Sequence, residues 1–220
     1  MFLSTLKRLL VLPIALVAGF AQDNPTDTKP KSENGSIILD LNGGWSFGFP
    51  AVRASVSTSA GSAISPEKTA LPAYGFDANV RAWKFLVPFF ELSAIDTGKA
   101  TASVGAYQAT AQANTYALNG GMRFESDHGR IRPYARFGGG TLRQTLSSTF
   151  SAGSSSTSLS GSGSAGEFMY GGGVRSFLGK HWGVDVGFDG YHVSRPLEGA
   201  GQNYSRLHFG WFLQSKSSVE

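Results

Sequence analysis

The stretch EFMYGGGVRSFLGKHWGVDVGFDGYHVS, residues 167–194, decides the fold of this chain. Apolar and polar positions alternate on both sides of Gly179-Lys180-His181, and a period of two predicts two β-strands joined by a turn. One face of this hairpin is uncharged and rich in aromatic residues, whereas the other carries Arg175, Asp185 and Asp189 at mid-strand. This pattern predicts that the apolar face meets lipid and that the charged face lines a closed barrel.

The rest of the chain repeats the pattern and predicts an all-β fold, an eight-stranded antiparallel up-and-down transmembrane β-barrel. Short periplasmic turns and longer outer loops are typical of such barrels, so both termini are expected in the periplasm. The short turns are 83–85, 126–130 and 179–181, and the longer connections are 50–73, 95–113, 143–166 and 195–203. The predicted strands are 36–49, 74–82, 86–94, 114–125, 131–142, the two halves of 167–194, and 203–213.

Two of the long connections have compositions that predict loops. Residues 147–166 are mostly Ser and Gly, and such a segment buries too little apolar area to offset the entropy lost on ordering, so a flexible loop is expected. Residues 50–73 are rich in Ser, Ala and Pro and are also expected to form a loop. Glycines inside the predicted strands, such as Gly171-Gly172-Gly173, are expected to leave interior room for long arginines.

The charged face of the predicted strands holds six acids, six arginines and no lysine. An arginine facing hydrocarbon at the bilayer midplane costs about 2–4 kcal/mol, so these side chains are expected to point inward. Eight strands enclose a space that side chains can fill, which predicts a network of arginine–carboxylate pairs and no open pore. Its members are Asp40, Asp77, Glu91, Glu167, Asp185 and Asp189 with Arg81, Arg123, Arg132, Arg136, Arg175 and Arg206.

Aromatic residues gather at both ends of the predicted lipid-facing band, as they do in transmembrane barrels. The expected outer rim consists of Phe47, Phe49, Tyr116, Phe168 and Tyr170, and the expected inner rim of Phe124, Trp182 and Trp211.

Residues 1–21 have the pattern of a secretory signal peptide, with Lys7 and Arg8 before a short apolar run and small residues before Gln22. The apolar run is about half as long as the roughly 20 residues that a membrane-spanning helix needs. Residues 22–35 are polar and predict a disordered periplasmic segment, residues 36–213 the barrel, and residues 214–220 a polar C-terminal tail.

Composition argues against several functional classes. Loss of Lys7 and Arg8 would lower the formal charge from +4 to +2, which is too weak an excess to indicate nucleic-acid binding. The chain has no cysteine, so disulfides, a thiolate nucleophile and cysteine-bound zinc are excluded. The glycine runs are not followed by Gly-Lys-Ser/Thr, so no phosphate-binding loop is predicted. No catalytic residue, cofactor or metal site is expected.

Three segments resemble the bacterial outer membrane protein β-barrel domain family. They are 39–47 (LDLNGGWSF), 120–124 with 132–135 (GGMRF and RPYA), and the hairpin 171–189. The resemblance spans roughly 36–213 and implies an eight-stranded barrel of the OmpA and OmpX type in a Gram-negative outer membrane. It also implies contact with outer membrane lipid and with the barrel insertion machinery, which recognises terminal aromatic residues. Here Trp211 and Phe212 are followed by eight further residues.

The histidines offer little support for catalysis. His128 and His181 fall in predicted turns, His208 points inward beside Arg206, and His192 lies at the outer rim but faces away from Asp189. We therefore expect a monomeric barrel with a structural or surface-interaction role, whose outer loops are candidates for contact with an extracellular ligand. Two alternatives stay open, a lipid-modifying enzyme or protease at the outer rim and a soluble secreted barrel of the lipocalin type.

Overall fold

The computed structural model describes residues 34–49, 51–127, 129–195 and 202–216. The predicted signal peptide, 1–21, and most of the predicted disordered segment, 22–35, lie outside the described residues. Within the described residues, no helix is long and apolar enough to cross a membrane. The strands are β1 (Ile37–Phe47), β2 (Ser55–Thr58), β3 (Gly61–Ile64), β4 (Ala70–Val80), β5 (Leu86–Ile95), β6 (Lys99–Val104), β7 (Tyr107–Glu125), β8 (Ile131–Ala152), β9 (Ser155–Phe177), β10 (Trp182–Val193) and β11 (Asn203–Gln214).

Eight of these strands form a closed antiparallel ring, which confirms the predicted fold. The order is β1, β4, β5, β7, β8, β9, β10 and β11, and β11 pairs again with β1. Closure follows from β1, which pairs with β4 along one edge and with β11 along the other. We call the end with the short connections after β4, β7 and β9 the turn end, and the opposite end the extended end.

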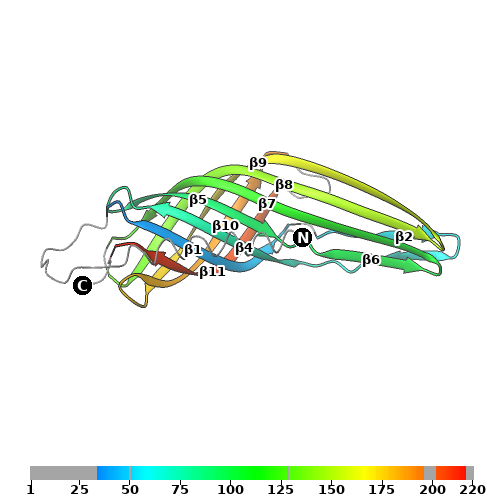
Figure 1. Ribbon diagram of the computed structural model, residues 1–220, viewed down its shortest axis with the longest axis horizontal. Helices are drawn as coiled ribbons and strands as arrows, with labels where there is room; N and C mark the ends of the chain where they lie inside the picture. The colour runs from blue at the N-terminus through cyan, green and yellow to red at the C-terminus, as the bar shows by residue number, and fades with distance from the viewer. Residues whose placement is uncertain (1–33, 50, 128, 196–201, 217–220) are drawn as a thin grey trace, which may run out of the picture.

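The predicted loops 50–73 and 147–166 are wrong in part, because much of each segment forms strands. β7, β8 and β9 continue past the ring as a projecting sheet, and β2, β3 and β6 lie beside its far part (Figure 1). β8 and β9 pair without interruption up to Ala152 and Ser155, and the turn between them contains Gly153 at a φ of 61°. A strand needs partners for its backbone groups rather than apolar side chains, and the neighbouring strands supply these partners.

Successive side chains along each strand point alternately to the inside and the outside of the ring, as predicted. Side chains of the predicted charged face are buried, and those of the predicted lipid face are largely exposed. Phe49 is the exception, since it is 4% exposed and packs edge-on against Tyr204 at 5.1 Å between ring centroids. The cause is Gly48, whose φ of 74° turns the chain after β1 ends at Phe47 and reverses the alternation.

Candidate functional site

All twelve charged residues predicted to face inward are buried inside the barrel. Glu125 is a thirteenth, 2% exposed, which the prediction missed by treating it only as the end of a strand. Its parity matches that of Arg123 two residues earlier, so the signal was present in the sequence. Among the described residues, the interior thus holds seven carboxylates and six guanidinium groups, with His208 beside them.

The half of the network nearer the turn end is centred on Glu125. Arg81 donates to one of its carboxylate oxygens, and the Arg175 Nη1 atom lies 3.4 Å from the other. The Arg123 Nε and Arg132 Nη1 atoms lie 3.7 and 3.9 Å from the Glu125 carboxylate oxygens. Four guanidinium groups, three from β7, β8 and β9 and one from Arg81 directly after β4, therefore meet at a single carboxylate, whose negative charge offsets part of their positive charge.

Arg175 extends this half of the network across the barrel. Its Nε donates to Asp185 on β10 at 3.0 Å, and its Nη2 donates to Asp40 on β1. Asp40 also accepts a hydrogen bond of 2.7 Å from the side-chain amide of Asn79. One arginine thus connects strands from opposite ends of the chain.

The half nearer the extended end is centred on Arg136. Its Nε and Nη2 both donate to Asp189, the Nε bond being 2.8 Å long, in the two-pronged geometry that makes arginine–carboxylate pairs strong. Its Nη1 lies 3.3 Å from Asp77 and 3.2 Å from Glu91. Arg206 reaches Glu91 at 2.7 Å and Asp189 at 3.4 Å. Two arginines therefore share three carboxylates.

His208 joins the two halves, in agreement with its predicted inward direction. Its Nε2 is 3.2 Å from Asp185, and its Nδ1 is 3.0 Å from Asp189. The Tyr134 hydroxyl donates to Asp185 at 2.9 Å and lies 3.2 Å from His208 Nε2. Gly187 makes the room for this contact, because a Cβ there would lie 2.5 Å from the Tyr134 hydroxyl and 2.7 Å from the His208 ring. The room at Gly187 thus serves a tyrosine and a histidine, whereas the sequence predicted that interior glycines make room for arginines.

Apolar layers cover the network at both ends of the barrel. Ile38, Val87, Phe177 and Phe212 form the layer at the turn end. Arg132 and Arg175 lie over the rings of Phe177 and Phe212, 4.6 and 4.7 Å from their centroids. The larger layer at the extended end consists of Phe49, Leu71, Ala73, Phe89, Ile95, Ala117, Leu142, Ala165, Met169, Tyr191, Val193 and Tyr204. The ionic network and the two apolar layers are therefore all buried within the ring.

The outer face of the ring is an apolar band bordered by aromatic residues. Trp182 and Trp211 are exposed and stack at 5.8 Å at the turn end, and Phe168 and Tyr170 are exposed on the other side of the band, as predicted. Trp83 and Phe85 in a short turn add further exposed aromatic rings. A continuous apolar belt of this kind on a closed sheet fits hydrocarbon rather than water.

The remaining predicted positions are placed as follows. His192 is exposed at the extended end, where its Nδ1 lies 2.8 Å from the side-chain oxygen of Asn203, and Asp189 is buried on the opposite face of β10. His181 lies in the turn before β10, with its Nδ1 3.1 Å from the backbone oxygen of Gln214. His128 lies outside the described residues.

Comparison with known proteins gives a family and a set of remote structural neighbours. Ail, the attachment invasion locus protein of Yersinia pestis, is 10% identical, with 82% of this chain and 99% of that chain covered and a TM-score of 0.49. Neisserial surface protein A is 13% identical with the same coverages and TM-score. The N-terminal barrel of Pseudomonas aeruginosa OprF is 12% identical, with coverages of 82% and 98% and a TM-score of 0.42.

No curated protein matches the chain. The model of the outer membrane protein beta-barrel domain, however, matches residues 15–211, which is most of the sequence. With the closed ring and its apolar belt, this match shows that the chain belongs to the outer membrane protein beta-barrel domain family and is an outer membrane β-barrel.

Proposed function

We propose that this protein is a monomeric, non-conducting, non-enzymatic barrel whose projecting sheet contacts partners outside the cell. The layered interior supports the absence of a pore, because apolar layers at both ends enclose an ionic network. In this proposal the signal peptide is cleaved, the barrel insertion machinery recognises the aromatic strand β11, and the extended end faces outward.

The open edge of β9 is the observation that carries the surface role. Within the described residues, β9 pairs with β10 only from Glu167 onward, and the backbone oxygen of Gly166 accepts a hydrogen bond from Ser194 N, so 155–165 pairs with β8 alone. This edge contains no charged residue and no proline, the features that usually protect an edge strand from pairing with other chains. Extended segments of other proteins can add to such an edge by backbone hydrogen bonding.

A labelled peptide with the sequence of residues 143–152, the β8 partner of this strand, is a direct probe of the edge. We expect it to bind the purified, folded barrel, and binding to fall when Thr157 and Leu159 are both replaced by Lys. Ser148→Lys is the matched control, because Ser148 lies on β8, where it pairs with Leu159 of β9, and is not on the edge.

Two further measurements test the absence of a pore and the outward direction of the extended end. In planar lipid bilayers the purified protein is expected to show no steady ion conductance, and protease added to intact cells is expected to cut the projecting sheet. Open-channel currents would refute the non-conducting role. Peptide binding that the two lysines leave unchanged would refute the edge as the contact surface.

A further inference from the structure

The outer face of β7, β8 and β9 continues from the apolar band into the projecting sheet without a change of strand parity. Directly paired residues form rows across this face, and the rows turn from apolar to polar as they leave the ring. In order, the rows are Met122–Phe137–Tyr170, Gly120–Gly139–Phe168, Leu118–Thr141–Gly166, Tyr116–Arg143–Ser164, Asn114–Thr145–Ser162 and Gln112–Ser147–Ser160. The surface that meets lipid is therefore continuous with a polar surface.

The row with Arg143 lies at the boundary between the apolar and the polar part of this face. Successive rows are two residues apart, or about 7 Å along a strand. The headgroup region adds roughly 5–8 Å to each side of the hydrocarbon core. Because Leu118 is the last exposed apolar residue of β7 below this row, Arg143 lies at the height of the lipid headgroups, and Ser147 lies about 13 Å further along the strand.

Two exposed cations lie on this face. Arg143 is exposed on β8, and Lys99 on β6 pairs directly with Gln112, which extends that row to a fourth strand. None of the rows from Tyr116 outward contains a carboxylate. Arginine and lysine placed this way suit phosphate groups, arginine by two-pronged hydrogen bonding and lysine as a point charge.

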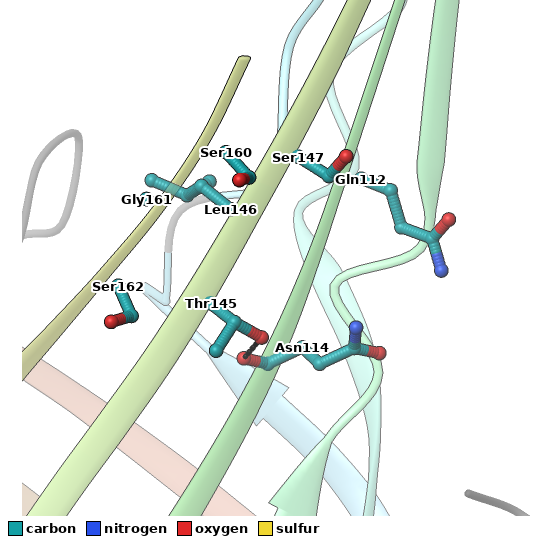
Figure 2. Close-up of a pocket in the computed structure, with 8 residues that line it drawn as sticks. All are labelled: Gln112, Asn114, Thr145, Leu146, Ser147, Ser160, Gly161 and Ser162. Carbon is teal, nitrogen blue, oxygen red and sulfur yellow. Dashed lines mark hydrogen bonds between the residues drawn. The ribbon is translucent and has the colours of Figure 1, made fainter. Parts of the chain in front are cut away.

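A groove on β7, β8 and β9 lies beside the two cations. Figure 2 shows its lining residues on three neighbouring strands, with the Thr145 hydroxyl donating to the backbone oxygen of Asn114 at 3.5 Å. The lining consists of hydroxyl groups, side-chain amides, one leucine and one glycine: Gln112, Asn114, Thr145, Leu146, Ser147, Ser160, Gly161 and Ser162. Neutral hydroxyl and amide groups both donate and accept hydrogen bonds, and these are the bonds that sugar hydroxyls require.

We propose that this face binds the headgroup of a phosphorylated glycolipid of the outer leaflet, with Arg143 and Lys99 on phosphate groups and the neighbouring groove on the sugars. The surface is continuous with the lipid-facing band, so a lipid already beside the barrel presents its headgroup to it. The placement rests on the proposed outward direction of the extended end.

Binding of purified phosphorylated lipopolysaccharide to the folded full chain in detergent tests the proposal. Removing two charge-assisted contacts in the double variant Arg143→Gln/Lys99→Gln is expected to weaken binding at least about ten-fold. Arg53→Gln, which removes an exposed positive charge elsewhere, is expected to leave binding unchanged. Ser147→Tyr, which fills the groove, is expected to weaken binding, whereas Ser148→Tyr on the opposite face of β8 is not.

Several results would overturn the proposal. One is unchanged binding by the double variant, and another is an equal loss with Arg53→Gln. Equal binding of phosphatidylglycerol, an anionic lipid without this sugar headgroup, together with no effect of Ser147→Tyr, would indicate charge attraction without a site. Each variant is checked for folding by heat-modifiable gel mobility. If Arg143→Gln does not fold, Arg143→Lys is used instead, and this variant should retain most of the binding because it keeps the charge.

The proposed function and this site can fail separately. Protease protection of the projecting sheet in intact cells would place it in the periplasm and refute the proposed orientation, whatever the binding in detergent. The other case is that protease cuts the projecting sheet in intact cells, but the double variant binds lipopolysaccharide in detergent as tightly as the unmodified protein. This result would refute the glycolipid site alone.

Discussion

Replacement of Arg136 by Met is expected to lower the free energy of unfolding of the barrel by about 3–5 kcal/mol, the usual cost of breaking a buried ion pair from one side. Arg136 holds Asp189 through two hydrogen bonds and lies 3.2–3.3 Å from Glu91 and Asp77. Arg206 still reaches Asp189 and Glu91 at 3.4 and 2.7 Å in the variant, which limits the loss at these two acids. Asp77 loses its guanidinium partner and keeps a hydrogen bond of 3.4 Å from Asn42.

The matched control is Arg143→Met, which removes the same side chain from the exposed face of the same strand. Its effect in glycolipid-free detergent is expected to stay within about 0.5 kcal/mol. Equilibrium denaturation with guanidinium, followed by tryptophan fluorescence and by heat-modifiable mobility, measures both. Adding Asp77→Asn to Arg136→Met should restore about 1 kcal/mol, because the unpaired acid is neutralised. A loss below about 1 kcal/mol for Arg136→Met, equal to that of Arg143→Met, would refute the ionic network as a structural element.

Three further predictions follow from single contacts. Gly187→Ala should destabilise the barrel by about 1–3 kcal/mol, since its Cβ would overlap Tyr134 and His208. Gly120→Ala should be nearly neutral, because its Cβ would lie 3.7 Å from the nearest atom. Comparable losses of stability for the two variants in denaturation experiments would contradict this prediction. Glu125→Gln should cost about 3 kcal/mol, because four guanidinium groups lose their shared carboxylate, and an unchanged denaturation midpoint would be the contrary result. Replacing residues 145–162 by a two-residue turn should leave the ring folded, as judged by heat-modifiable mobility, since these residues lie beyond the ring, and loss of the mobility shift would show that the ring depends on them.

The side of each strand that faces the interior could be predicted from the sequence, because a period of two leaves only two choices and buried charge decides between them. The twelve inward charges and the exposed Trp182 and Trp211 follow from this rule. The rule could not predict Phe49, since a single left-handed glycine before it changed the parity. It also could not predict that most of residues 147–166 would be strand, because strand formation there depends on backbone partners in β7 and β8 rather than on local composition.

The sequence by itself therefore determined the closed barrel, its two faces and the charge inside it. Only the tertiary structure decided which charges meet, as with Arg175 and Asp40, which are 135 residues apart and share a hydrogen bond. The physical reason is that pairing inside a barrel depends on the register of all eight strands at once, whereas the preference of a side chain for lipid or interior depends only on its own strand. The same register placed Arg143 and Lys99 on one outer surface.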